Sequence, residues 1–415
     1  MLYKPTSPPM GWNSFDCYGW SVDEDEFREN VDFMAENLLK FGYEYCVVDF
    51  CWFRPGKGKI SPPNQVWTGN VPDVSLVLDP YGRPTPAPDK FPSCCGGFKA
   101  LADHVHKKGL KFGLHFMSGI PRQAVVNRLP VFDSSLTAAD IASDNGCDWL
   151  NLNLAIDYSV PGAEKYVRSV VRLIDEWDVD FIKLDDALRP IRKEEIAVWA
   201  EALGRLPRKV ALSLSPGEPP IMEAEFLREY SAMWRVMDDL WDRKEDLKKI
   251  TRAAARWHSA LSEGAYPDLD MLPMGRLLYS DDPAGRGTRL TKRAEKYMFT
   301  LWCFARSPLI LGGRLNTLSP YELGLVTDGK LLKISQNSEN TRMYQINDNI
   351  YVWASETQDT EYYALFNSDT RFIRKASAES LSNIAGCDIA AYTLRHSQKA
   401  MYLRPLESRV LRKPK

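Results

Sequence analysis

The chain has 415 residues, of which 44% are apolar and 26% are charged, and its formal net charge is −2. These values are ordinary for a globular protein, and the near balance of charge gives no reason to expect nucleic acid or an anionic membrane as a partner. The length predicts one large domain followed by a smaller one.

Several other classes of protein are disfavoured by local sequence. No apolar run reaches the roughly 18 residues that a membrane helix needs. The opening MLYKPTSPPMGW lacks the apolar region of a signal peptide, and its prolines would interrupt one. We therefore expect a cytoplasmic protein, or a secreted one if a leader has been removed. The eight cysteines have neither disulfide-framework nor zinc spacing, and the five histidines form no metal triad, so we expect reduced thiols and no metal or cofactor.

Short apolar runs alternate with amphipathic helical patterns from residue 10 to about residue 312. The predicted strands are 10–14, 45–50, 112–116, 181–185, 210–215, 233–239, 268–272 and 308–312. Helical patterns lie between them, for example at 24–42, 98–109 and 162–177. Eight strands with intervening helices predict an α/β fold, a (β/α)8 TIM barrel over residues 1–317, with an open doubly wound sheet as the alternative.

Two connections, 51–97 and 117–160, are too long to be simple turns and are expected to act as lids or binding loops. The pattern changes past residue 318. Segments 341–356 and 360–369 alternate apolar and polar residues and are separated by Asn, Asp and Gly. They predict a small antiparallel β-sandwich domain over 318–415, without a cluster of titratable residues.

The segment 181-FIKLD-185 places charges in an otherwise apolar strand. Side chains alternate between the two faces of a strand, so Lys183 and Asp185 share one face while Ile182 and Leu184 share the other. Helices cover the outside of a barrel, which puts the apolar pair outside and the charged pair inside. Asp185, and not Asp186, is therefore the interior carboxylate.

The same alternation applied to five other strands places polar side chains inward near the strand ends. These are Asp49, His115, Ser213 with Ser215, Arg235 with Asp239, and Asp268 with Asp270. Any one of the charges could be a structural ion pair. Because a buried unpaired charge is costly, their convergence favours pairing with one another and with a polar ligand.

Paired carboxylates without a histidine or cysteine nucleophile suit glycoside hydrolysis, in which one acts as nucleophile and the other as acid/base. Inward Lys183 and Arg235 suit the binding of sugar hydroxyls. One alternative is a magnesium-dependent barrel enzyme that uses Asp49, Asp185 and Asp239 as ligands. Another is a non-catalytic sugar-binding protein. The two cations beside the carboxylates disfavour a divalent metal, so we expect a carbohydrate partner and no metal.

Several motifs resemble those of glycoside hydrolase family 27, the α-galactosidases and α-N-acetylgalactosaminidases. They are PPMGWNS at 8–14, GLKFGLHF at 109–116, FIKLD at 181–185, WRVMDDL at 234–240, PDLDML at 267–272 and SPLILGG at 307–313. The resemblance implies a retaining exo-α-glycosidase that acts by double displacement on terminal α-galactosides or α-N-acetylgalactosaminides. It implies that Asp185 is the nucleophile and Asp239 the acid/base, with Lys183, Arg235 and Asp270 binding the sugar.

The chain departs from the family pattern at the expected sugar ligands. Of two aspartates that hold O4 and O6 in the family, Asp49 remains and Phe50 replaces the other. Phe15 stands for a tryptophan near C6, and His115 for a tyrosine. The missing aspartate leaves a β-L-arabinopyranosidase, acting on a sugar without the C6 hydroxymethyl, as an alternative.

Two further departures follow the fourth and fifth predicted strands. Ala187 replaces a disulfide cysteine of many members, in agreement with a reducing compartment. Ser215 falls where α-galactosidases place a glutamate against the 2-hydroxyl and α-N-acetylgalactosaminidases place a small serine. Ser215 therefore favours tolerance of an N-acetyl group at C2, although Pro216 replaces the aromatic residue that follows it in the family.

Overall fold

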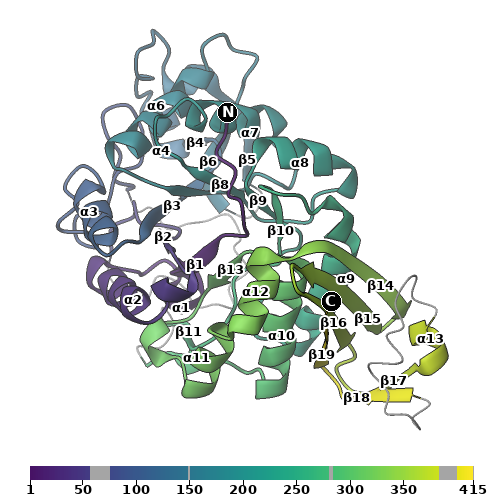
Figure 1. Ribbon diagram of the computed structural model, residues 1–415. Coiled ribbons are helices and arrows are strands. Elements are labelled where there is room, and N and C mark those ends of the chain that lie inside the picture. The colour runs from purple at the N-terminus through teal and green to yellow at the C-terminus, as the bar shows by residue number, and fades with distance from the viewer. Residues whose placement is uncertain (57–74, 148–149, 280–283, 383–399, 415) are drawn as a thin grey trace.

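The computed structural model describes residues 1–56, 75–147, 150–279, 284–382 and 400–414 (Figure 1). Eight parallel strands form its central sheet: β1 (Met10–Asn13), β2 (Tyr45–Val48), β3 (Lys111–Met117), β7 (Phe181–Asp185), β8 (Ala211–Leu214), β9 (Met233–Arg235), β10 (Tyr266–Asp268) and β13 (Leu309–Leu311). Each pairs with the next along the chain, and β13 pairs with β1. A parallel bridge between Leu272 and Leu311 joins the remaining edges, so the sheet closes as the predicted (β/α)8 barrel.

Helices surround the barrel and connect its strands (Figure 1). The longer ones are α2 (Glu24–Asn37), α3 (Lys99–Lys107), α6 (Glu164–Glu176), α7 (Lys193–Leu203), α8 (Ala224–Tyr230), α9 (Lys244–Trp257) and α10 (Lys292–Ala305), with short α1 (Phe15–Tyr18) after β1. Single 3-10 turns are η1 (Leu39–Phe41), η2 (Ile221–Glu223), η3 (His258–Ala260) and η4 (Leu315–Thr317). Helix α2 shows how sequence sets an end: Asp23 and Glu26 form a reciprocal capping box that satisfies two free N–H groups.

The predicted alternation of faces is confirmed along the barrel strands. The inner face carries an apolar cluster that includes Tyr45, Val47, Phe181, Met233, Tyr266 and Ile310. All of these except Ile310 lie two or four residues before a predicted inward polar residue of the same strand. Ile182 and Leu184 instead belong to the larger cluster between sheet and helices. Glycine is required on the tight inner face at Gly113, where a Cβ would lie 2.8 Å from Val47 Cγ2.

Two predicted strands are too long. Strand β9 ends at Arg235 and β10 ends at Asp268, so Asp239 and Asp270 lie in the loops that follow and alternation does not govern them. Beyond the strand ends, a side-chain hydrogen bond takes the place of backbone pairing between strands: the Asp270 carboxylate accepts from the Leu240 N–H at 2.7 Å. Asp270 also has a φ of +85°, which takes it out of the extended conformation.

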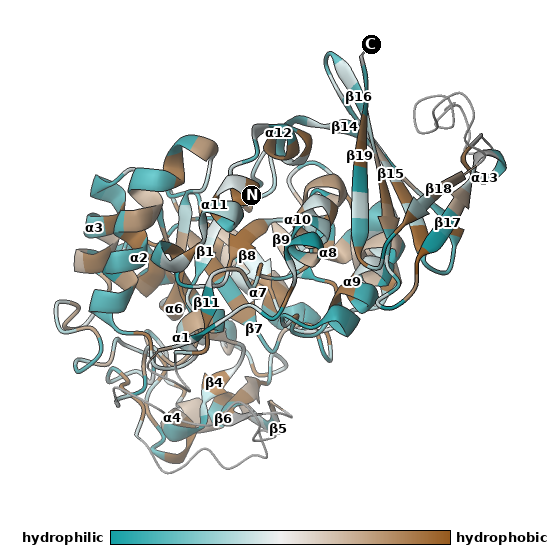
Figure 2. Cartoon of the chain, turned by 90° about the horizontal axis from the view of Figure 1, so that it is seen from below, coloured by the Kyte–Doolittle hydropathy of each residue, from teal (hydrophilic) through white to brown (hydrophobic). Residues whose placement is uncertain are grey.

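The long connection 117–160 folds as a small substructure. Strands β4 (Ile120–Pro121), β6 (Leu150–Ile156) and β5 (Ala142–Cys147) form an antiparallel sheet, with α4 (Arg122–Val126) and α5 (Ala138–Ile141) beside it. Figure 2 shows β4, β5, β6 and α4 gathered at one end of the molecule, away from the C-terminal strands. The Ser118 N–H donates to the Asp185 carbonyl at 2.9 Å, so this insertion adjoins the carboxyl end of β7. Residues 57–74 of the other long connection lie outside the described residues.

The C-terminal region contains the predicted antiparallel strands. Strands β14 (Glu339–Asn347), β15 (Ile350–Thr357), β16 (Thr360–Asn367) and β19 (Glu407–Pro414) form one sheet, and β17 (Arg374–Ser377) pairs with β18 (Ala400–Leu403) in another, next to α13 (Ala378–Ser382). Val352 and Leu365 of the first sheet and Leu403 of the second share one buried core. Helices α11 (Pro320–Val326) and α12 (Gly329–Asn337) precede these strands. The division of the chain at residue 317 stays a prediction.

No helix in the described ranges is both long and apolar enough to cross a bilayer. The seven cysteines within those ranges form no disulfide.

Candidate active site

Asp185 ends strand β7, and three donors surround its carboxylate. His115 Nε2 lies 2.9 Å from Oδ2, while the Asp186 N–H and the Ser215 hydroxyl reach Oδ1 at 2.8 and 3.2 Å. A carboxylate only accepts hydrogen bonds, so the proton of the His115 ring must be on Nε2. Burial alone would raise the pKa of Asp185, but these donors and the Lys183 ammonium lower it below its ordinary value. Asp185 is therefore held as an anion.

Lys183, two residues earlier on β7, pairs with Asp49 just after β2. Its Nζ lies 2.9 Å from Asp49 Oδ2, and the Asn13 amide donates to the same oxygen at 2.6 Å. Burial opposes the charge of Asp49, yet Lys183 lowers the pKa of Asp49 to about 2. The pKa of Lys183 is raised, because Asp49 and Asp185 outweigh the effect of burial. The strand ends therefore present an ion pair beside the anionic Asp185.

A second group of charges follows β9 and β10. Arg235 Nη2 lies 2.7 Å from Asp270 Oδ2 and 3.2 Å from Asp239 Oδ1. The Arg235 and Asp270 side chains are 3% and 5% exposed, whereas that of Asp239 is 61% exposed. Burial raises the pKa of Asp270 to about 6, although Arg235 opposes the shift. Asp239 is thus a carboxylate open to solvent and tethered to a buried cation.

The carboxylates next to Asp185 and Asp239 in the chain pair with other residues. Asp186 turns away from Asp185 and pairs with Arg192 at 2.7 Å. Asp238 forms an exposed ion pair with Arg189 at 2.8 Å. Neither residue is hydrogen-bonded to Lys183 or to Arg235 in the described part of the chain.

Aromatic residues line the β1–β3 side of the charged group. Lys183 Nζ lies 5.9 Å from the centroid of the Phe15 ring. The Phe50 and His115 ring centroids are 5.2 Å apart, and Phe50 also contacts Trp20 at 5.5 Å. Phe50 lies two residues beyond the end of β2, and its ring packs against that of His115, the histidine that contacts Asp185.

A cavity of about 20 Å³ lies directly beneath these side chains. Its wall includes Lys183, Ser213, Ser215, Arg235, Asp268 and Asp270, together with residues of the inner apolar cluster. That volume holds about one water molecule, and the wall offers several polar partners. The structure thus brings all nine predicted site residues, Phe15, Asp49, His115, Lys183, Asp185, Ser215, Arg235, Asp239 and Asp270, to the carboxyl ends of the barrel strands.

No protein-family model matches the chain, but solved structures and curated relatives do. A family 27 β-L-arabinopyranosidase of Geobacillus stearothermophilus is 38% identical, with 98% of this chain and 96% of that chain covered and a TM-score of 0.87. The chain belongs to glycoside hydrolase family 27. A Bacillus halodurans protein assigned provisionally as an α-N-acetylgalactosaminidase is 33% identical, with 99% of both chains covered and a TM-score of 0.82. The α-galactosidase of Cyamopsis tetragonoloba is 24% identical over 95% of this chain and 81% of its own.

The protein is therefore a glycoside hydrolase, and its family 27 fold carries the charged group at the end of the barrel where TIM-barrel enzymes keep their active sites. An Asp→Ala variant of the Geobacillus enzyme, 37% identical to this chain, was solved in complex with arabinose.

Sequence reasoning did not single out two polar residues of this family 27 site, Asn13 and Asp16, and it placed Asp268 on the inner face without giving it a role. Asn13 orients Asp49, and alternation along β1 could have found it, because Gly11 and Asn13 share a face. Asp268 accepts a hydrogen bond from the Asp270 N–H at 2.9 Å. Asp16 is 2% exposed, and its Oδ2 has no hydrogen-bond partner among the described residues. Burial and the nearby carboxylate of Asp270 raise the pKa of Asp16. Asp16 lies in a helix of four residues, which is too short to show a hydrophobic periodicity in the sequence.

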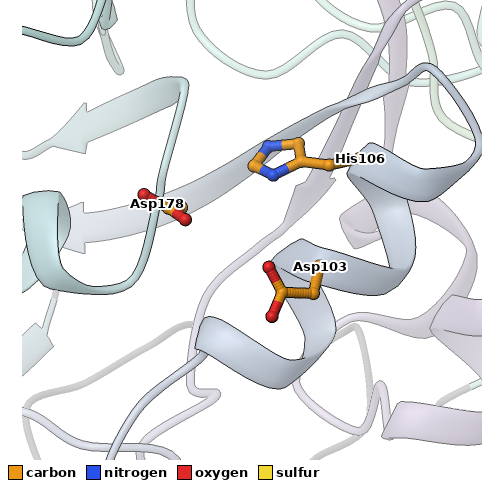
Figure 3. A group of neighbouring side chains, drawn as sticks. All are labelled: Asp103, His106 and Asp178. Atoms are coloured by element: carbon orange, nitrogen blue, oxygen red, sulfur yellow. The ribbon is translucent and has the colours of Figure 1, made fainter.

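One group of side chains in the described ranges has ligand atoms close enough to hold a metal, namely Asp103, His106 and Asp178 (Figure 3). Asp103 and His106 lie on α3, and Asp178 precedes β7. Lys99 already forms ion pairs with both aspartates, and Arg208 pairs with Asp178. The positive charges of Lys99 and Arg208 thus already neutralise the two aspartates that a metal ion would need as ligands. Strand β7 separates Asp178 from Asp185 at its other end.

Proposed function

We propose that the protein is a retaining exo-glycosidase that removes a terminal α-galactosyl or related residue by double displacement. Asp185 attacks the anomeric carbon while Asp239 protonates the leaving oxygen. Asp239 then activates the water that hydrolyses the glycosyl-enzyme. The observation that carries the proposal is the unlike state of the two carboxylates. The Asp185 side chain is 13% exposed and accepts hydrogen bonds from three donors, whereas that of Asp239 is 61% exposed beside Arg235.

A retaining mechanism requires the two carboxyl groups to lie about 5–5.5 Å apart around the substrate. The first sugar product should then have the anomeric configuration of the substrate. Proton NMR of the product, recorded before mutarotation, measures this directly. An initial product of opposite configuration would rule out the double displacement.

The sugar ligands in this proposal are Phe15, Asp49, His115, Lys183, Ser215, Arg235 and Asp270. Lys183 and Arg235 supply donors to sugar hydroxyls, and Asp49 accepts from them. The Arg235 and Lys183 side chains are only 3% and 14% exposed and are already paired, so they need little ordering when a sugar binds. The proposal includes no metal, because Lys183 already pairs with Asp49 and Arg235 with Asp239 and Asp270. Treatment with EDTA should therefore leave turnover unchanged.

The substrate is tested by comparing kcat/KM on 4-nitrophenyl α-galactoside, α-N-acetylgalactosaminide, β-L-arabinopyranoside and α-glucoside. The proposal expects turnover of the α-galactoside or of a sugar with the same ring configuration, and none of the α-glucoside, whose O4 points the other way. Failure to turn over any of them would favour a non-catalytic sugar-binding protein.

A β-L-arabinopyranosidase is the second candidate, and Phe50 is the observation that favours it. Phe50 stands where the family pattern has an aspartate for O4 and O6, and its ring packs against His115 and Trp20. A phenyl ring there removes a hydroxyl acceptor and suits a pentopyranose without a C6 hydroxymethyl. Phe50→Asp should then raise the ratio of α-galactoside to β-L-arabinopyranoside turnover. An unchanged ratio would show that Phe50 does not read C6.

Ser215 is proposed to read the group at C2 of the sugar. Its hydroxyl lies 3.2 Å from Asp185 Oδ1, so a larger side chain would enter the space beside the nucleophile. Ser215→Glu should depress turnover of the α-N-acetylgalactosaminide far more than that of the α-galactoside. Equal losses on both substrates, or a wild type inert to the N-acetyl sugar, would remove this role from Ser215.

Two coarser expectations belong with this function. Residues 1–317 are proposed to form the catalytic unit and residues 318–415 an accessory β-domain. A cytoplasmic location is also proposed, in keeping with the free thiols of the described residues, and cell fractionation would test it.

A further inference from the structure

A tight turn follows β10 beside the proposed acid/base. The Asp268 carboxylate accepts the N–H of Asp270, two residues on, at 2.9 Å. An aspartate that bonds its own backbone in this way folds the chain into an Asx turn. Asp270 adopts a φ of +85°, which non-glycine residues rarely take unless their surroundings hold them there. Asp268 therefore stabilises an unfavourable conformation of Asp270.

That conformation makes Asp270 the centre of a small network. Its Oδ1 accepts from the Met271 N–H and its Oδ2 from the Leu240 N–H, each at 2.7 Å. Oδ2 also lies 2.7 Å from Arg235 Nη2. The turn after β10 is thereby joined to the loop after β9, which carries Asp239.

The orientation of Asp239 depends on this network. Arg235 Nη2 lies 3.2 Å from Asp239 Oδ1 and donates to the Met237 carbonyl at 3.2 Å. The next residue, Leu240, is held through its N–H by Asp270. A carboxylate with an exposed side chain keeps one geometry only if its neighbours are fixed, and here Asp270 fixes both of them.

We propose that Asp268 is a positioning residue for the acid/base, acting through Asp270 on Arg235 and Leu240 and so on Asp239. This rests on the proposed role of Asp239. Asp268 is 6% exposed and lines the same cavity as Arg235 and Asp270. Its role is to place the proton donor, and because Arg235 and Asp270 are also proposed sugar ligands, its removal should add a smaller loss that is common to all substrates.

The test is the dependence of kcat/KM on the leaving group. Aryl α-galactosides with 2,4-dinitrophenyl, 4-nitrophenyl and phenyl groups are compared, or the β-L-arabinopyranosides if that sugar is turned over faster. Asp268→Ala removes the acceptor of the Asp270 N–H. We expect a loss of less than about tenfold on the dinitrophenyl substrate and a further loss of about 100-fold on the phenyl substrate, because only the latter needs a well-placed acid.

Two variants separate positioning from mere folding. Asp268→Asn keeps an oxygen that accepts the same N–H and should restore all three substrates to within about threefold of wild type. Ser307→Ala removes the acceptor of the Leu269 N–H, 3.0 Å away in the same turn, without touching Asp270. It should lower the melting temperature without steepening the leaving-group dependence. If Asp268→Ala does not fold, Asp268→Ser, with a shorter acceptor, is measured in its place.

Equal losses on all three substrates for Asp268→Ala, or failure of Asp268→Asn to restore them, would overturn the proposal. Asp239→Ala, measured on the same series, keeps this result apart from the proposed function. If Asp239→Ala shows the leaving-group dependence and Asp268→Ala does not, only the positioning role fails. If Asp239→Ala shows none, the acid/base assignment itself fails.

Discussion

The two sides of the active site hold their carboxylates in opposite ways. On the side formed by β2, β3 and β7, the Asp185 side chain is 13% exposed and receives hydrogen bonds from residues on or next to the strands. On the side formed by β9 and β10, Asp239 lies beyond the end of its strand, and its side chain is 61% exposed.

The difference matches the role proposed for each group, Asp185 as nucleophile and Asp239 as acid/base. A nucleophile must be ionised and fixed before the substrate arrives, and strands with buried donors provide both conditions. An acid/base must exchange its proton with water in every cycle, which needs access to solvent. Its placement then depends on side-chain contacts in a loop, through Arg235 and Asp270.

The largest effect is expected at the nucleophile. Asp185→Ala should lower kcat by about 10,000-fold or more on every substrate, because no other carboxylate can form the glycosyl-enzyme. Asp186→Asn is the matched control, since Asp186 pairs with Arg192 and faces away from the sugar. Its kcat should stay within about tenfold of wild type. Comparable losses in the two variants would remove Asp185 from its role.

The acid/base side should respond selectively. Asp239→Ala should lower kcat/KM by about 100-fold to 10,000-fold on a phenyl glycoside and far less on a dinitrophenyl glycoside, whose leaving group needs no proton. Asp238→Asn is the control, because Asp238 forms an exposed ion pair with Arg189. A uniform loss over both substrates in Asp239→Ala would contradict its assignment as acid.

Removing a hydrogen-bond donor to Asp185 should lower the activity less than removing either carboxylate. His115→Phe removes the hydrogen bond to Oδ2 and should lower kcat/KM by about 10-fold to 100-fold, the usual worth of a bond to a charged group. The acidic limb of the pH–rate profile should move to higher pH, because His115 lowers the pKa of Asp185. Ser215→Ala, which removes a neutral donor at 3.2 Å, should move that limb less. An unmoved limb in His115→Phe would show that the histidine does not keep Asp185 ionised.

The smallest effect concerns stability on the nucleophile side. Lys183 depresses the pKa of Asp49 to about 2 in the folded protein, against an ordinary value of 3.8. The ionised carboxylate therefore stabilises the fold above about pH 4, by about 2 kcal/mol, and this contribution is lost as the pH falls toward 2. Urea unfolding of wild type and Asp49→Asn from pH 7 to pH 3 measures it. The difference in unfolding free energy should narrow below pH 4, and a difference that stays constant over this range would contradict the pairing.

Much of the fold followed from the sequence because the strands of a barrel have two chemically distinct faces. The alternation in FIKLD alone separated Asp185 from Asp186, and the structure agrees. The count of apolar runs gave the eight strands. The same rule predicted strands that are too long at 233–239 and 268–272, because these strands end at Arg235 and Asp268.

Local sequence was enough to predict the barrel, the family and the inward residues of each regular strand, since period-two patterning is local and needs no partner. The orientations of Asp239 and Asp270, the packing of Phe50 against His115 and the hydrogen bonds of Asp268 and Asn13 depend instead on tertiary contacts. These contacts join residues that lie beyond the strand ends or on different strands. Their geometry is set by side-chain hydrogen bonds and close packing in three dimensions, which no local pattern encodes.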